Sequence, residues 1–155
     1  MDKNNNAATA STAEREIVAT RVLNAPRELV FKVWTDPEHI MHWWGPNGFT
    51  NTIHEMDVRP GGVWRFIMHG PDGVDYDNKN IYNEVVKPER LEYDHVSSPR
   101  HHVTVTFEDR GGKTKLTMQM LFDTSEELNR TIEKFGAVEG LNETLGRLTE
   151  YLLKI

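Results

Sequence analysis

The feature that most constrains the fold is the stretch of residues 35–46, which reads TDPEHIMHWWGP. Asp36 supplies a helix N-cap, and Pro37 supplies a preset backbone angle for the first helical turn. The adjacent rings of Trp43 and Trp44 then fall at the end of this short helix, where a Gly-Pro pair stops it at once. This combination predicts a fold with short helices against a larger layer, and it indicates the mouth of a pocket.

The residues before this stretch predict one strand and one further helix. Residues 16–23 are rich in β-branched side chains and are followed by Asn24, a turn residue. This pattern is typical of a strand. Pro26 at a first helical position then opens a helix. The apolar residues of that helix share one face, and they are Leu29, Val30, Val33 and Trp34.

A long run of short strands follows. Each is separated from the next by a turn sequence such as Pro-Gly-Gly or Gly-Pro-Asp-Gly. Apolar and polar side chains alternate along them, with Trp64, Phe66 and Met68 at the apolar positions of one strand. One face of the sheet is therefore apolar and the other is exposed to solvent. The predicted strands are residues 49–58, 62–69, 79–87, 90–97, 101–109 and 113–122.

The last segment predicts one long amphipathic helix over residues 124–153. It begins with a capping-box pattern at Thr124, and its apolar residues recur at steps of three and four. Gly136 and Gly140 fall within this helix, where each costs about 1 kcal/mol relative to alanine. We therefore expect a bend there, or a close approach of the helix to a sheet or a ligand.

Together these segments predict an α+β helix-grip fold. A curved seven-stranded antiparallel sheet would wrap around the long C-terminal helix, with two short helices after strand one. Residues 1–14 are rich in Asn, Ala, Thr and Ser and predict a flexible tail. Residues 15–155 form the single predicted domain, a length that suits one core.

Composition excludes several classes of partner. The net charge is −6 without a basic cluster, which argues against nucleic acid binding. No apolar run reaches the length of a membrane span, and the first residues lack a signal peptide pattern. The chain has no cysteine. We therefore expect a cytoplasmic protein without disulfides, cofactor or metal, which is either a monomer or a homodimer.

Large apolar residues on inward positions are candidates for lining a pocket, because rigid rings and flexible thioethers give contact area at low entropic cost. The alternative for each is plain core packing, which is the better interpretation of Trp34 and the default for Met118, Met120 and Phe135. These candidates are Trp34, Trp43, Trp44, Phe66, Met68, Met118, Met120, Phe135 and Leu141.

Polar residues on inward positions are more informative, because a buried polar atom needs a partner. Strand parity predicts a shared cavity face for four of them, where they would orient a ligand: Tyr82, Glu84, Tyr93 and His95. The alternative is that they satisfy one another or reach solvent at the rim.

Other reactive side chains give little support for metal binding or nucleophilic catalysis. His101 and His102 are adjacent on a strand and therefore point to opposite faces, which excludes joint chelation of a metal. Ser97 lies at a strand end without an evident activating base, so nucleophilic catalysis gains no support.

Several ordered motifs carry a resemblance to a known family. They include Trp34 with the Thr-Asp-Pro that follows, the Trp-Trp-Gly-Pro of residues 43–46, the Pro-Gly-Gly of residues 60–62 and the Pro-Glu-Arg-Leu of residues 88–91. Over residues 15–153 the chain resembles the SRPBCC or START-like superfamily. Within it, the chain is most similar to homologues of the C-terminal domain of the activator of the heat-shock-protein ATPase.

The resemblance implies a hydrophobic cavity between the C-terminal helix and the sheet, holding a lipid, a polyketide-like molecule or another apolar ligand. Many relatives carry Gly-Trp where this chain has Gly140 and Leu141, so the cavity should be roomier there. An enzyme of cyclase, dehydratase or hydrolase type is the second hypothesis, with Glu84, Tyr82 and His95 as acid/base candidates. A chaperone ATPase-stimulating role is the third. Because the START-like domain fills nearly all of the 155 residues, we expect no separate chaperone-engaging domain, and we expect binding and not catalysis.

Overall fold

The structure is a computed structural model that describes residues 12–155. The predicted flexible tail falls largely outside the described residues. Its last three residues form a short 3-10 helix, η1 (Thr12–Glu14), which leads directly into the first strand. None of the described helices is long and apolar enough to cross a membrane.

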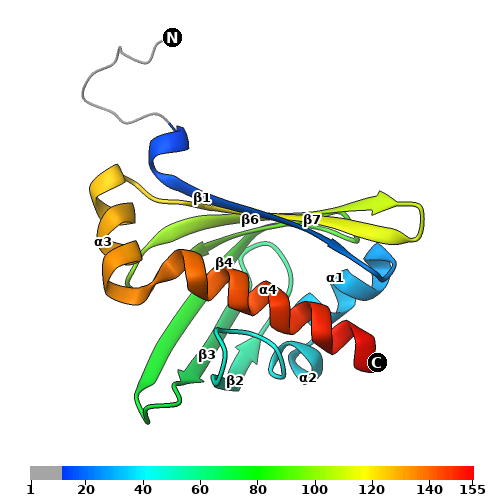
Figure 1. The fold of residues 1–155 in the computed structure, drawn as a ribbon, viewed down its shortest axis with the longest axis horizontal. Helices are drawn as coiled ribbons and strands as arrows, with labels where there is room; N and C mark the ends of the chain where they lie inside the picture. Colours follow the sequence, from blue (N-terminus) through cyan, green and yellow to red (C-terminus); the bar gives the residue numbers. More distant parts are fainter. Residues whose placement is uncertain (1–11) are drawn as a thin grey trace.

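Seven strands form one antiparallel sheet, as predicted. Their spatial order is β1-β7-β6-β5-β4-β3-β2, so the first strand returns to lie beside the last and the other neighbours follow the chain (Figure 1). Short turns connect consecutive strands from β2 onward, which is why they pair as a meander. The strands are β1 (Glu16–Leu23), β2 (Thr50–Met56), β3 (Val63–His69), β4 (Asp75–Val86), β5 (Arg90–His95), β6 (His101–Arg110) and β7 (Lys113–Leu121).

The helices cover one face of this sheet. Helices α1 (Arg27–Thr35) and α2 (Pro37–Ile40) follow β1, and α3 (Ser125–Phe135) and α4 (Ala137–Lys154) end the chain. In Figure 1, α4 crosses in front of the sheet, with α3 at its N-terminal end and with α1 and α2 near its C-terminal end. The α+β helix-grip architecture is therefore confirmed.

The prediction of one long C-terminal helix is wrong in one respect, because Gly136 divides it into α3 and α4. Gly136 has φ 60° and ψ 46°, and its N–H donates to the carbonyl of Ile132 at 2.9 Å. This left-handed conformation ends α3, and it is accessible to glycine without the steric cost that a Cβ brings. The apolar period continues on both sides, so periodicity alone could not reveal the break.

The largest differences in element boundaries concern α2 and β4. Helix α2 ends at Ile40, so Trp43 and Trp44 lie in the turn that follows it and not on the helix itself. The N–H groups of both tryptophans still donate to the carbonyl of Ile40, at 3.2 and 3.1 Å. Strand β4 begins at Asp75 and not at residue 79, because its first residues pair with β3 although they are exposed and polar.

The core is most densely aromatic where α1 and the turn after α2 meet the sheet. Trp34, Trp43 and Trp64 are each fully buried. The rings of Trp34 and Trp43 lie 4.9 Å apart at 65°, an edge-to-face geometry that aromatic pairs favour. Trp44 joins them to the sheet, with its ring 5.1 Å from that of Trp64. Here the rings fill the space between the layers.

Candidate ligand-binding site

A cavity of about 230 Å³ lies between the α3–α4 junction and the inner face of the sheet. The sheet contributes aromatic and methionine side chains, whereas the helices contribute mostly small residues together with Phe135 and Leu141. The residues that line it are Trp44, Gly45, Pro46, Phe66, Met68, Asn78, Asn80, Tyr93, His95, Pro99, His101, Val103, Met118, Met120, Thr131, Phe135, Ala137, Gly140, Leu141 and Thr144. No Lys, Arg, Asp or Glu is among them.

A wider groove of about 720 Å³ lies outside the cavity and shares part of its wall, including Met68 and Phe135. Phe135 is 47% exposed and belongs to both spaces, which places its ring at the boundary between them. The groove therefore forms the mouth of the cavity. Its charged residues are Asp75, Asp77, Lys134, Glu139 and Glu143.

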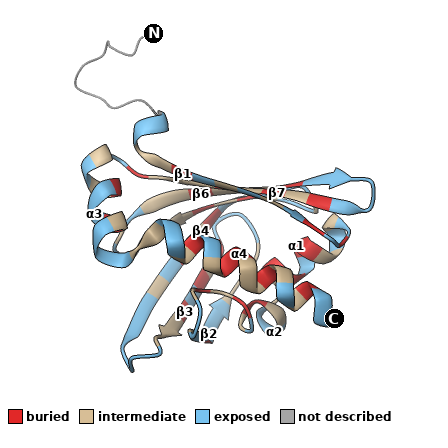
Figure 2. Cartoon of the chain, viewed as in Figure 1, coloured by how far each residue is buried: buried red, intermediate tan, exposed pale blue. Residues whose placement is uncertain are grey.

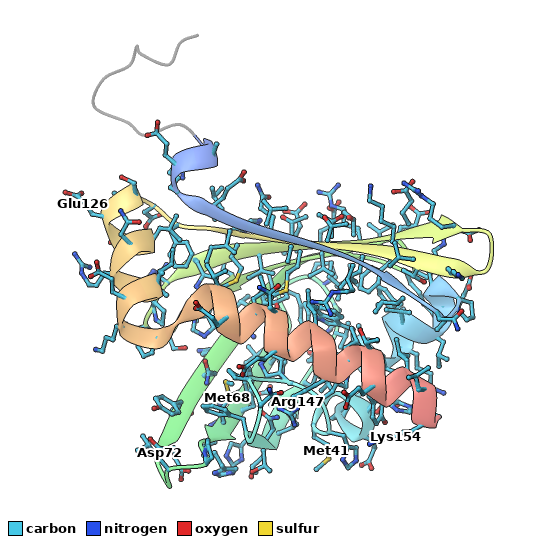
Figure 3. The ribbon with its side chains drawn as sticks, viewed as in Figure 1. Met41, Met68, Asp72, Glu126, Arg147 and Lys154 are labelled. Carbon is cyan, nitrogen blue, oxygen red and sulfur yellow. The ribbon has the colours of Figure 1, made fainter. Side chains whose placement is uncertain are left out.

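The loop that forms one cavity wall is held by Arg147 of α4. Its guanidinium lies within 2.9–3.3 Å of five carbonyl oxygens, and Figure 3 shows this side chain on the side of α4 where that loop runs. These carbonyls belong to His42, Trp44, Gly45, Pro46 and Phe49. A planar group with five N–H donors suits such a set. Arg147 thereby fixes the position of Trp44 against the cavity.

The close approach predicted for the glycines of the C-terminal segment is found at Gly140. A Cβ on this residue would lie 3.3 Å from Cγ of Pro46, in the loop that Arg147 holds. The neighbour is therefore a loop proline, and neither the sheet nor a ligand. Gly140 lets α4 approach the loop and also leaves open space at the cavity wall.

Two histidines form the polar end of the cavity. The rings of His95 and His101 stack at 4.7 Å, and the Nδ1 atoms of both lie within 2.9 Å of the carbonyl oxygen of Pro99. Because a carbonyl only accepts, each Nδ1 carries the proton when the ring is neutral. In that tautomer His95 Nε2 is an acceptor, and the hydroxyl of Ser97, 3.3 Å away, can donate to it. Oδ1 of Asn78 also lies 2.7 Å from this nitrogen, but as an amide oxygen it cannot donate to it.

Burial keeps these groups uncharged. Burial and the nearby His95 lower the pKa of His101 to about 3, and burial also lowers the pKa of His95. The pKa of the Tyr93 phenol is raised by burial above its usual value. The cavity thus presents neutral rings and hydroxyl groups at physiological pH, and it lacks a fixed charge that could neutralise an ion.

Comparison with known proteins agrees with this geometry. The profile of the family described as "Activator of Hsp90 ATPase homolog 1-like protein" matches residues 24–153. The chain belongs to this family. The resemblance to the START-like superfamily, made from the motifs around the tryptophans, is thereby confirmed. The comparison with curated proteins finds no match.

Solved structures of similar fold extend the comparison. A protein from Nitrosomonas europaea is 24% identical with a TM-score of 0.81, covering 92% of this chain and 96% of its own. One from Arthrobacter aurescens is 23% identical with a TM-score of 0.86, covering 94% and 90%. An AHSA1-like protein from Aeromonas hydrophila is 21% identical with a TM-score of 0.71, covering 90% and 92%. At these identities the likeness concerns the fold.

Within this family fold, the structure gathers many of the residues predicted from the sequence around one cavity and separates others from it. Those that line the cavity are Trp44, Phe66, Met68, Tyr93, His95, Met118, Met120, Phe135 and Leu141. Trp34 and Trp43 do not line it, because they are sealed in the aromatic core. The indole N–H of Trp43 donates there to the carbonyl of Val33 at 3.2 Å.

The acid/base group predicted from strand parity does not assemble. The register of β4 against β5 shifts between Tyr82 and Glu84, where a β-bulge inserts an extra residue. Glu84 consequently pairs opposite Glu92 on the outer face, where its carboxylate lies 2.7 Å from Arg90. Tyr82 keeps its inward direction but is buried beside Trp64 without reaching the cavity. The prediction that Glu84 shares the cavity face is therefore corrected.

Sequence reasoning missed several residues of the site. Asn80 has the same strand parity as Tyr82 and could have been found by that signal. His101 was considered only as a metal ligand, although its inward direction follows from its strand position. Ser97 has its Oγ 3.3 Å from Nε2 of His95, so a histidine is near it after all. Ser97 lines neither the cavity nor the groove, however, so this contact is structural.

Proposed function

We propose that this protein binds a small apolar or aromatic molecule in the cavity between the α3–α4 junction and the sheet. The observation that supports the proposal most is the lining itself, which combines apolar and aromatic walls with a few neutral polar groups. Pockets for small molecules have this composition. The groove beside Phe135 gives such a molecule a route from solvent.

The methionines of the lining suit a ligand-binding wall as well as a core. Met68, Met118 and Met120 all reach the cavity from the sheet. Their flexible thioethers adapt to irregular shapes and make favourable contacts with aromatic rings. An aromatic molecule in the cavity would therefore contact thioethers on the sheet side, and small residues together with Phe135 and Leu141 on the helix side.

A matched pair of substitutions on α4 tests this function. Ala137 lines the cavity, whereas the next residue, Val138, is 39% exposed and lines neither the cavity nor the groove. Ala137→Phe should fill the cavity and abolish binding, and Val138→Phe should leave it unchanged. The measurement is a thermal-shift titration with naphthalene-type aromatics, after mass spectrometry of any molecule that co-purifies.

The size of the expected shift follows from mass action. A ligand at a hundredfold excess over its Kd adds about 2.7 kcal/mol to the stability of the folded state. For a domain of this size that corresponds to a rise in Tm of several degrees. Equal shifts in the two variants would show that the ligand binds elsewhere, and no shift in the wild-type protein would remove the proposal.

The family description bears the name of an Hsp90 ATPase activator, which also raises a chaperone role. That name is its support, since no contact within residues 12–155 bears on it. A coupled ATPase assay with the cognate chaperone separates the two roles. Stimulation that persists in Ala137→Phe would place the activity outside the cavity.

A further inference from the structure

Asn80 stands apart from the other polar residues of the cavity. It lies on β4 between Trp64 of β3 and His95 of β5, and its side chain is directed to the inner face of the sheet. It is only 1% exposed. Its Oδ1 atom is buried and has no hydrogen-bond partner among the described residues. A buried amide in this condition is unusual, since nearly all such groups are paired.

Most other polar side chains of the cavity make hydrogen bonds within the protein, and among the described lining residues the buried polar atom without a partner is that of Asn80. Thr131 and Thr144 donate their hydroxyl protons to carbonyls of their own helices, at 2.8 Å in each case. Asn78 donates its amide N–H to the carbonyl of Tyr76, and its Oδ1 lies beside Nε2 of His95. The two histidines share the carbonyl of Pro99. Asn80 is thus poised to pair with whatever enters the cavity.

We propose that Asn80 is the polar anchor of this cavity and that it selects a neutral hydroxylated aromatic of about two rings. The inference rests on the proposed binding function and deepens it. A phenolic hydroxyl is the fitting group, because it can donate to the amide oxygen and can also accept from the amide nitrogen. A ligand of the same shape without that hydroxyl leaves Asn80 buried and unpaired.

The volume sets the size of the ligand. An apolar cavity of about 150 Å³ holds one benzene ring. The cavity here, about 230 Å³, therefore admits a two-ring aromatic. Larger molecules must extend past Phe135 into the groove.

Charge sets a second limit. An anion loses its hydration on entering the cavity, and no lysine or arginine lines it to compensate. The groove outside carries Asp75, Asp77, Glu139 and Glu143 against the single cation Lys134, so an approaching anion is also repelled. Carboxylates such as fatty acids or aromatic acids are accordingly poor ligands.

Three probes of nearly equal shape test the inference by calorimetric or fluorescence titration: 2-naphthol, 2-methylnaphthalene and 2-naphthoate. The protein variants are wild type, Asn80→Leu and the control Asn83→Leu. Asn83 lies on the same strand but is exposed, with its amide donating to Asp94. The informative quantity is the ratio of the Kd of 2-methylnaphthalene to that of 2-naphthol, which cancels the general effect of each substitution.

We expect Asn80→Leu to lower this ratio roughly tenfold or more, the cost of leaving one buried polar group unpaired. Asn83→Leu should leave the ratio unchanged. In the wild-type protein, 2-naphthoate should bind at least roughly tenfold more weakly than 2-naphthol. Asn80→Val serves as a second variant if the leucine does not fold, with the same expected direction.

The outcomes distinguish a failure of the role assigned to Asn80 from a failure of the proposed binding function. If 2-methylnaphthalene and 2-naphthol both bind and their ratio is unaffected in Asn80→Leu and Asn80→Val, the cavity binds aromatics but Asn80 is not its anchor. Equal binding of 2-naphthoate would overturn the charge limit. If no probe binds to the wild-type protein up to its solubility limit, the proposed function and this inference both fail.

Discussion

The two ends of α4 cover the same sheet in different ways. Toward its C-terminus, α4 presents Leu145, Leu148 and Leu152, which are buried against the packed core. Toward its N-terminus it presents Ala137, Gly140 and Thr144, and there a cavity remains. Figure 2 shows the same contrast, with exposed and half-buried residues in the first turn of α4 and buried ones farther along.

This difference shows what makes the pocket. Large apolar side chains line the sheet at both ends, as Trp64 does at one and Phe66 and Met118 do at the other. The packed end is filled because Trp34 and Trp43 enter it from α1 and the turn after α2. At the open end the rings of Trp44 and Phe135 border the cavity without filling it, and α4 presents Ala137, Gly140 and Thr144 there, which are small. The cavity therefore depends on small helical residues as well as on the large side chains of the sheet.

The largest expected effect tests the packed end. Trp43→Ala removes a fully buried ring with an internal hydrogen bond and should lower the free energy of unfolding by about 3–5 kcal/mol. Trp44→Ala, at the cavity wall, should cost less because one side of that ring already faces open space. Urea denaturation measures both. Equal losses would mean that the two ends are packed alike.

The second prediction concerns Arg147, which ties the two ends together through the loop of Trp44. Arg147→Met removes the guanidinium from five carbonyls and should destabilise the protein by about 2–3 kcal/mol, although the carbonyls of Trp44 and Pro46 keep a second donor each. Arg147→Lys should recover only part of this, because an ammonium cannot reach so many acceptors. A control is Arg21→Met, whose guanidinium makes one long contact to Asn142 at 3.5 Å. Denaturation in urea again gives the comparison, and full rescue by lysine would refute the assigned role.

The third prediction uses pH to probe the polar end of the cavity. His101 has a pKa of about 3 in the folded protein, whereas an unfolded histidine titrates near 6.5. Below pH 6.5 the unfolded chain therefore binds the additional proton, and stability falls as the pH drops toward 3. One such proton changes the free energy of unfolding by at most about 1.4 kcal/mol per pH unit.

His101→Phe should remove this part of the pH dependence while keeping the stacking on Phe122. The control is His102→Phe. His102 lies on the outer face, with Nδ1 2.8 Å from Asp94, and is not buried in the cavity. Melting curves between pH 7 and 4.5 provide the measurement. If the pH dependence of stability is unchanged in His101→Phe, the pKa of His101 is not lowered in the folded protein.

The smallest expected effect compares two glycines near and within α4. Gly136 has a positive φ of 60°, so Gly136→Ala should cost about 1–2 kcal/mol. Gly146 lies inside α4 with open space around it, so Gly146→Ala should stabilise by about 0.5–1 kcal/mol. Thermal denaturation distinguishes these opposite signs. Stabilisation by both would mean that α3 and α4 join as one helix.

The sequence predicted the layers well because they depend on repeated signals. Alternation along strands such as residues 62–69 indicated which side chains face inward, and turn residues separated each strand from the next. Many consecutive residues support each such inference. The shared motifs around Trp34 and Trp43 then identified the family, which the profile match confirmed.

Features that depend on one residue escaped prediction. A single bulge on β4 turned Glu84 to the outer face, and the left-handed Gly136 divided the last helix without disturbing its apolar period. The division between filled and open ends also depends on three-dimensional packing. Nothing in the sequence around Trp43 and Trp44 distinguishes the ring that is sealed in the core from the ring that lines the cavity.

The most direct test of a ligand cavity at the open end uses the methionines as probes. In protein labelled with carbon-13 at the methionine methyl groups, Met68, Met118 and Met120 line the cavity, whereas Met41 and Met56 lie outside it. Titration with 2-naphthol should shift the first three signals by ring-current effects and leave the other two in place. If the cavity signals stay fixed while binding is detected, or if all five move alike, the ligand does not occupy this cavity.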